Sequence, residues 1–88
     1  MDGDMRPNLV TSMIWLVADT FDVAPSSITQ ATRPDEVNGW DSLGHSVLLT
    51  RVARKFDLTM TEELAAPIVD IAEFTSRIAA LIGGHSHD

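Results

Sequence analysis

Apolar residues in this chain recur at intervals of three and four positions over three segments, which is the spacing of one face of an α-helix. The segments run from Asn8 to about Phe21, from Ser42 to about Phe56, and from Asp70 to a Gly83-Gly84 pair that we expect to end the last helix. Before the third segment, Thr61 to Leu64 predicts one helical turn that Pro67 would stop. No stretch shows the alternation of a β-strand. The pattern predicts an all-α bundle of three main helices and one short helix.

Two connections separate these helices, and the first of them, residues 22–41, is long for so small a domain. Loops of about 20 residues are generally functional or are held down by their own apolar residues. We expect Val23, Ile28 and Val37 to hold this one. It would bring the chain back to where the first helix began, with the first two helices roughly antiparallel. From the second connection we expect three apolar residues to fill the core: Met60, Leu64 and Ile68.

The length of 88 residues leaves room for a single hydrophobic core. We expect one domain over residues 8–82, flanked by disordered tails at residues 1–7 and 83–88. The chain contains no cysteine, which excludes disulfides, thiolate metal sites and a cysteine nucleophile. Any sulfur chemistry would need a sulfur atom carried on an attached group.

The formal net charge of −7 argues against nucleic-acid binding through phosphate neutralisation. The N-terminus is acidic where a signal peptide would be basic. The longest unbroken apolar run, Met13 to Ala18, is too short to span a membrane. We therefore expect a cytoplasmic protein that binds neither nucleic acid nor a membrane.

The stretch Gly39-Trp40-Asp41-Ser42-Leu43 comes directly before the second segment and is typical of a helix start. Either Asp41 or Ser42 can act as the N-cap, whose side-chain oxygen accepts a backbone N–H of the first turn. Ser42 then has two interpretations. It is a cap and nothing more, or it carries a phosphate ester, because a helix N-terminus offers free N–H groups and a positive dipole end to an anion. These five residues alone favour the cap.

Projection of the second segment onto a helix, at about 100° per residue, separates two faces. One face is the expected core stripe of Leu48, Leu49, Val52 and Phe56, and His45 falls within the same arc. On the opposite face, Leu43 and Val47 lie one turn apart beside Ser42 and would face water. We interpret this face as a docking patch, made of Leu43, Val47, Thr50 and Arg54.

The order of these elements, with Asp41-Ser42-Leu43 opening the second helix, resembles the acyl carrier protein family, whose members carry 4′-phosphopantetheine. The likeness runs from Leu9 to about Leu81. It includes Phe21-Asp22-Val23 at the end of the first helix and Phe56-Asp57 at the end of the second. An Asp-Ser-Leu tripeptide is weak evidence by itself, but its place between these landmarks is specific. The resemblance implies an acyl-carrier-like bundle and favours the functional interpretation of Ser42.

The resemblance implies that Ser42 is the attachment residue, esterified from coenzyme A by a phosphopantetheinyl transferase. The thiol of the attached arm would carry an acyl or aminoacyl group as a thioester and deliver it to other enzymes. The carrier itself would be a monomer with no catalytic residues and no metal site. Enzymes that load and transfer acyl groups would be its other partners. The transferase would recognise Asp41 and Leu43, and the partner enzymes would recognise Leu43, Val47, Thr50 and Arg54.

The second helix departs from the better-known fatty-acid carriers, in which it tends to be acidic. Here it contains no acid and has three basic residues, Arg51, Arg54 and Lys55, which favours partners with acidic or apolar docking sites. The run Trp-Asp-Ser-Leu-Gly-His looks more like discrete carriers of specialised pathways, whether polyketide, nonribosomal peptide or another acyl-transfer system. A small helical interaction module without a prosthetic group is the competing hypothesis from another class. A hydrolase acting through Ser42 is more remote, because His45 is its only candidate general base.

Five further side chains have an ordinary structural interpretation that we favour. His45 is expected to be packed or hydrogen-bonded rather than in contact with an attached arm. Trp15 and Trp40 are expected to be packing residues rather than ligand platforms. The two histidines of the C-terminal tail, His85 and His87, do not make a designed metal site.

Overall fold

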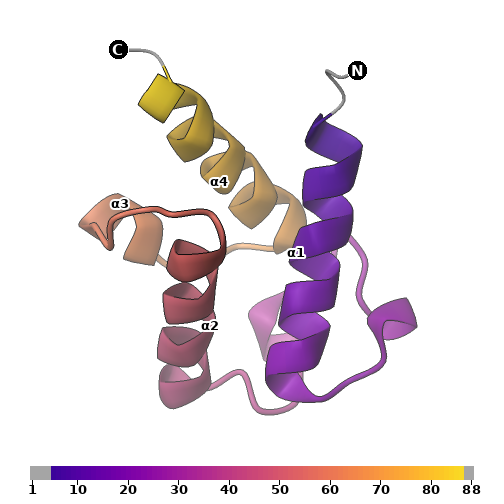
Figure 1. The fold of residues 1–88 in the computed structure, drawn as a ribbon. Helices are drawn as coiled ribbons and strands as arrows, with labels where there is room; N and C mark the ends of the chain where they lie inside the picture. Colours follow the sequence, from indigo (N-terminus) through magenta and orange to yellow (C-terminus); the bar gives the residue numbers. More distant parts are fainter. Residues whose placement is uncertain (1–4, 87–88) are drawn as a thin grey trace.

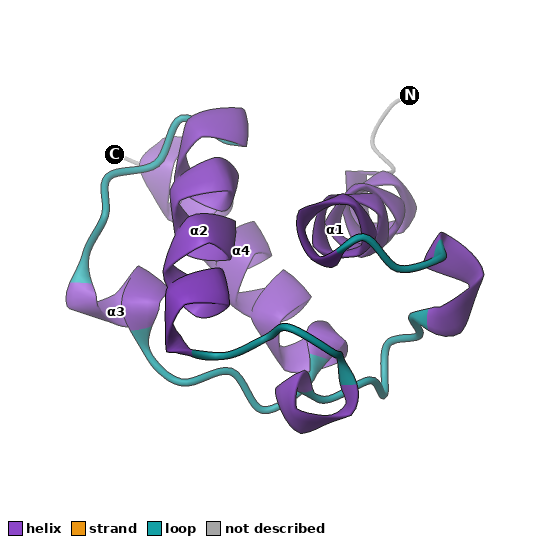
Figure 2. Cartoon of the chain, turned by 90° about the horizontal axis from the view of Figure 1, so that it is seen from below, coloured by secondary structure: helices purple, strands orange, loops and turns teal. Residues whose placement is uncertain are grey.

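The computed structural model of the chain describes the backbone of residues 5–86 and the side chains of residues 9–83. Four α-helices and two 3₁₀ turns make up this part of the chain, which contains no β-strand (Figure 1 and Figure 2). Three helices are long and one is a single turn, so the predicted all-α fold is confirmed. In chain order the elements are α1 (Met5–Phe21), η1 (Pro25–Ser27), η2 (Pro34–Glu36), α2 (Ser42–Lys55), α3 (Glu62–Ala65) and α4 (Ile71–Ser86).

The first and last helices extend further than the sequence predicted. Residues 5–7 form the first turn of α1 instead of a tail, and Pro7 is tolerated there because its missing N–H would have no intrahelical partner. At the other end, α4 continues through Gly83-Gly84. A glycine ends a helix by adopting a left-handed backbone, and Gly83 has no positive φ. The other residues of the two expected tails, 1–4 and 87–88, lie outside the described residues.

The C-terminal ends of α1 and α2 are built alike. Asp22, just beyond α1, has a φ of 56°, and Asp57, just beyond the Phe56 cap of α2, has a φ of 55°. The residue after each aspartate donates its N–H back into the last turn, over 3.0 Å to Ala18 O in α1 and 2.8 Å to Ala53 O in α2. A left-handed residue followed by such a bond is a common helix stop, here with aspartate where glycine is usual.

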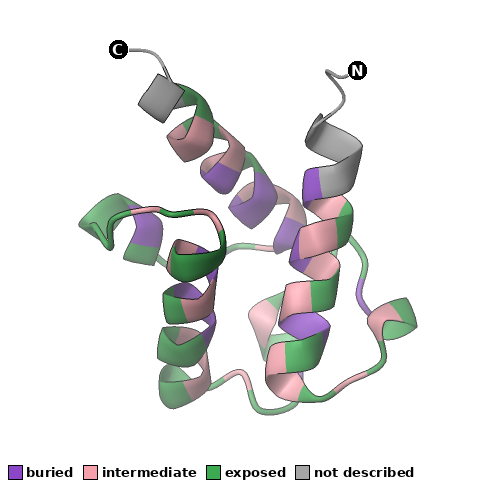
Figure 3. Ribbon diagram, in the orientation of Figure 1, coloured by how far each residue is buried: buried purple, intermediate pink, exposed green. Residues whose placement is uncertain are grey.

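The helix α1 packs against both α2 and α4, and the core lies between them (Figure 1). The predicted core stripe of α2 is confirmed at Leu48, Leu49 and Val52, which are buried, while Phe56 is half-buried (Figure 3). Apolar residues of α1, α3 and α4 complete the core. Its largest fully buried side chains are Met13, Val17, Leu48, Val52, Leu64, Ile71, Phe74 and Ile78.

Two predictions about core residues are wrong. Trp15 is 59% exposed. It lies two positions from both Met13 and Val17, which turns it about 200° away from the buried face of α1. Met60 is 46% exposed, and Leu58 packs against the core in its place. The other expected core residues of this connection, Leu64 and Ile68, are buried.

The connection between α1 and α2 is held by its own apolar residues, as predicted. Ile28 and Val37 are buried, and Val23 packs against the core from a half-buried position. Two of its carbonyls also accept hydrogen bonds from the first turn of α4, Gln30 O at 2.9 Å and Thr32 O at 3.0 Å. The loop is therefore part of the packed structure.

This loop ends beside the last turn of α1, and not where α1 begins, so its predicted path is wrong. The ring of Trp40 stacks on the ring of Phe21, the last residue of α1, with centroids 5.0 Å apart. The expected antiparallel arrangement of α1 and α2 holds, because the loop leaves and returns at the same end of α1 (Figure 1). Arg51 of α2 adds a second tie to this end of α1, donating to Thr20 Oγ1 at 2.8 Å and to Asp19 Oδ2 at 2.6 Å.

A single arginine of α4 holds the α3 segment in place. The side chain of Arg77 is 9% exposed and pairs with Glu73 Oε2 at 2.7 Å. Its guanidinium also donates to three backbone carbonyls around the end of α3, those of Leu64 at 3.1 Å, Ala66 at 2.8 Å and Pro67 at 2.8 Å. These carbonyls have no helical partners beyond so short a helix, and the arginine supplies the missing donors.

Candidate functional site

The first turn of α2 is capped by Asp41, which decides between the two candidate caps. Asp41 has an extended backbone, and its Oδ1 accepts the N–H of Gly44 at 2.9 Å. Ser42 is the first residue of the helix and is exposed. Among the described residues, none makes a hydrogen bond with its hydroxyl. The Ser42 hydroxyl is therefore free of a capping role and open to solvent.

Two glycines bring this turn against the end of α1. Gly39 has a φ of 91°, a left-handed conformation that other residues rarely adopt. At Gly44, a Cβ atom would lie 2.4 Å from Gly39 O and 2.6 Å from Cε1 of Phe21. The backbone of α2 thus approaches both the loop and α1 more closely than any side chain allows, which fixes the position of the Ser42 turn. A glycine inside a helical pattern was the only sequence signal for this contact.

Trp40 and His45 form a hydrogen-bonded pair next to Ser42. The indole Nε1–H of Trp40 donates to Nδ1 of His45 at 3.1 Å, and the two ring centroids lie 6.4 Å apart. The predictions that Trp40 packs and that His45 is hydrogen-bonded are confirmed. Because Nδ1 acts as the acceptor, the proton of the neutral imidazole resides on Nε2.

This pairing bears on the hydrolase hypothesis. A serine nucleophile needs a base within hydrogen-bonding reach, and His45 makes no hydrogen bond with Ser42. The one lone pair of the neutral imidazole is already used by Trp40. The geometry therefore gives the Ser42 hydroxyl no general base at His45.

A shallow groove of ≈ 690 Å³ opens beside Ser42. One wall comes from α2, through Ser42, His45 and Ser46, and the opposite wall comes from the α3 segment that Arg77 holds. Its lining is completed by Pro34, Trp40, Asp41, Ala65, Pro67 and Ile68. The groove runs between the N-terminal turn of α2 and α3, so a group attached to Ser42 has an apolar surface within reach.

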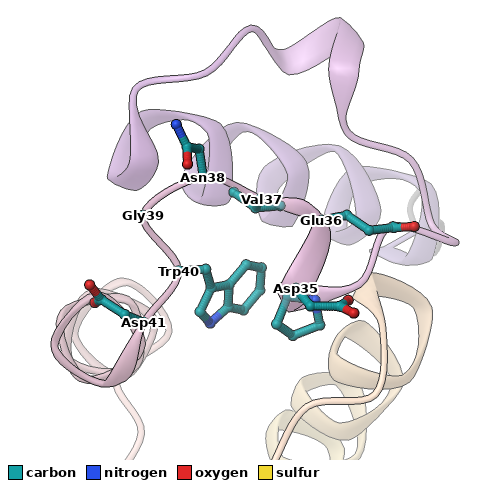
Figure 4. A pocket seen from close by; sticks show the side chains of 8 residues that line it. Asp35, Glu36, Val37, Asn38, Gly39, Trp40 and Asp41 are labelled. Atoms are coloured by element: carbon teal, nitrogen blue, oxygen red, sulfur yellow. The ribbon is translucent and has the colours of Figure 1, made fainter.

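A second hollow, of ≈ 400 Å³, lies on the loop side of the same tryptophan and is lined by residues 34–41. Figure 4 shows the Trp40 indole at its centre, between Asp41 at the start of α2 and Asp35 of η2. Its carboxylates come from Asp35, Glu36 and Asp41. The loop side of the Ser42 turn is therefore acidic, in contrast to the apolar groove.

The outer face of α2 is oriented as the helical projection predicts. Leu43 is 75% exposed and Val47 is 44% exposed, and Thr50 and Arg54 on the same face are exposed as well (Figure 3). Arg54 makes no ion pair with any described residue, whereas Arg51 is paired with Asp19. The face next to Ser42 thus combines two exposed apolar side chains with a cation at its far end.

Within the described part of the chain, no three His, Cys, Asp or Glu residues are grouped so that they hold a metal ion. The side chains of His85 and His87 lie outside that part. None of the helices in the described range is long and apolar enough to cross a lipid bilayer.

Three residues that build this site were missed in the sequence: Gly44, Arg77 and Pro34. From its sequence neighbours alone, Arg77 would be interpreted as an exposed partner for Glu73 one turn away, and no nearby residue indicates its hydrogen bonds to α3.

No family model matches the chain, and searches of curated proteins and of solved structures find no match either.

Proposed function

We propose that this chain is an acyl carrier protein that bears 4′-phosphopantetheine on Ser42. The observation that carries the proposal is the exposed Ser42 hydroxyl at the first residue of α2, released from capping by Asp41. The all-helical fold and the position of Asp41-Ser42-Leu43 after a long ordered loop are in keeping with the sequence resemblance to this family. When bound, the group supplies a thiol that holds an acyl or aminoacyl cargo as a thioester.

The residues around Ser42 fit such a group. A phosphodiester on the Ser42 oxygen would lie at the N-terminus of a 14-residue helix, where unpaired N–H groups and the helix dipole favour an anion. The adjoining groove offers apolar walls from Pro34, Pro67 and Ile68. Because the chain has no cysteine, a thiol must come from an attached group.

We assign partner recognition to the outer face of α2. Leu43 and Val47 supply apolar contact area beside the attachment residue, and Arg54 supplies a positive charge. With no acid on α2, this face suits enzymes whose docking surfaces are apolar or acidic. The partners would be a phosphopantetheinyl transferase and acyl-loading and acyl-transferring enzymes of a fatty-acid, polyketide or other specialised pathway, or of a nonribosomal peptide system.

The experiment that tests the proposal is incubation with coenzyme A and a broad-range phosphopantetheinyl transferase, followed by intact-mass measurement. We expect a gain of one phosphopantetheinyl group in the wild type, its loss in Ser42→Ala, and its retention in Ser46→Ala. Ser46 is a matched control because it is also exposed, lies one turn further along α2 and lines the same groove. A gain that survives Ser42→Ala, or no gain at all, would overturn the proposal.

A second candidate function is favoured by the exposure of Leu43 and Val47. A small helical interaction module would use the same apolar pair for docking, without any prosthetic group. The mass experiment separates the two, because the module would bind its partner yet take up nothing from coenzyme A.

A further inference from the structure

We propose that His45 is the hydrogen-bond donor to the phosphodiester on Ser42, through its Nε2–H. This inference rests on the proposed function, because it assumes that Ser42 is modified. It assigns a role to the one titratable side chain that lines the groove from within α2. It also assigns a role to Trp40, which prepares that donor.

Trp40 fixes the tautomer of His45. The indole N–H of Trp40 donates to Nδ1 of His45 at 3.1 Å, and an indole nitrogen is a donor only. Nδ1 must therefore accept, which leaves the proton of the neutral ring on Nε2. The stack of Trp40 on Phe21, with centroids 5.0 Å apart, fixes the indole that imposes this choice.

His45 lies next to Ser42 on the surface of α2. Residues three apart on a helix are neighbours on its surface, with Cβ atoms about 5–6 Å apart. Helical side chains also lean toward the N-terminus of their helix, so the His45 side chain leans toward the Ser42 turn. Both residues line the same groove, and His45 is half-buried while Ser42 is exposed.

The phosphodiester is the acceptor that the His45 Nε2–H would meet. The phosphate oxygens are the acceptors nearest the Ser42 oxygen, and a hydrogen bond to an anion is stronger than one to a neutral carbonyl. Two nearby carboxylates add negative charge but do not take this donor. Asp41 is engaged as the cap of α2, and Asp35 lines the neighbouring hollow and not the groove. Of the two ring N–H groups of Trp40 and His45, the Nε2–H of His45 is thus the one that remains free to donate.

The experiment compares the imidazole of His45 in the unmodified and modified protein by ¹⁵N–¹H and ³¹P NMR at mildly alkaline pH. We expect Nε2–H and bare Nδ1 in both forms. On modification, solvent exchange of Nε2–H should slow about tenfold or more, because it gains an anionic acceptor. The ³¹P resonance of the modified protein should also shift in His45→Phe, but stay in place in Ser76→Ala, which changes an exposed serine of α4 outside the groove.

The variant Trp40→Phe tests the role of the indole, because it keeps an aromatic ring against Phe21 but lacks the indole N–H. We expect it to mix the two His45 tautomers and to reduce the protection of Nε2–H. A proton on Nδ1 in the unmodified wild type would overturn the inference even if a variant fails to fold. If exchange slows on modification but the ³¹P resonance is unchanged in His45→Phe, Nε2–H donates to a carbonyl of the arm and not to the phosphate. That result would overturn the inference as well. If the wild type takes up no group at all, the proposed function fails first, and mass measurement shows this separately.

Discussion

The Gly44→Ala substitution tests the close approach that positions the Ser42 turn. A methyl group at residue 44 would meet Gly39 O at 2.4 Å and Phe21 Cε1 at 2.6 Å, with Asp41 Oδ1 at 3.3 Å. The nearest of these is a backbone oxygen that cannot rotate away. On an open helix surface, alanine in place of glycine would stabilise the fold by about 1 kcal/mol. Overpacking typically costs about 1–3 kcal/mol, and a contact of 2.4 Å with a backbone oxygen belongs in the upper half of that range, so the steric cost exceeds the propensity gain.

We therefore expect Gly44→Ala to lower the free energy of unfolding by about 1–2 kcal/mol. For a domain of this size, that corresponds to a drop in Tm of roughly 4–16 °C. Thermal and urea denaturation followed by circular dichroism measure it. Gly83→Ala is the matched control, because nothing lies within 4 Å of its Cβ position in α4. It should stabilise by up to about 1 kcal/mol. A Gly44→Ala protein as stable as the wild type would refute the close approach.

Three further predictions concern the groove wall, the two faces of α2 and a helix end. Arg77→Leu should lower the free energy of unfolding by about 2–4 kcal/mol, because it removes the donor to three carbonyls and a carboxylate. The control is Arg33→Ala, which changes an exposed arginine in a loose ion pair and should alter the free energy of unfolding by less than about 1 kcal/mol. Equal effects in urea denaturation would contradict this. Val47→Glu should leave the melting curve unchanged but slow acyl transfer by partner enzymes, whereas Val52→Ala should lower the free energy of unfolding by about 1–3 kcal/mol. An unfolded Val47→Glu protein would show that the assignment of buried and exposed faces to α2 is wrong. Asp57→Gly should stabilise by up to about 1 kcal/mol, since glycine adopts the left-handed φ of 55° without strain, and a lower urea midpoint would count against that reason.

Helical spacing was sufficient to predict which side of α2 is buried. Leu48 and Val52 are fully buried and Leu43 is exposed, because these positions follow from a local period of 3.6 residues. The short helical turn before Pro67 also formed where it was predicted, and Thr61 Oγ1 caps it by accepting the N–H of Leu64 at 3.2 Å. Such features depend on residues a few positions apart, and the sequence displays them directly.

Features that depend on distant residues were not predictable in this way. The end of the long loop depends on the stack of Trp40 against Phe21, and Gly44 is required only because that stack and Gly39 lie beside it. Trp15 fell on the exposed side of α1 because only one face of that helix meets α2 and α4, which the apolar pattern around α1 did not reveal. The Arg77 bonds to α3 likewise exist only in the folded chain.

The central claim is that one hydroxyl, that of Ser42, accepts phosphopantetheine. Its most direct test is peptide mapping by tandem mass spectrometry after incubation with coenzyme A and the transferase. The proposal predicts a single modified peptide whose fragments place the group on Ser42. Modification placed on Ser46, or an unmodified peptide after complete turnover of a known carrier in the same tube, would contradict it.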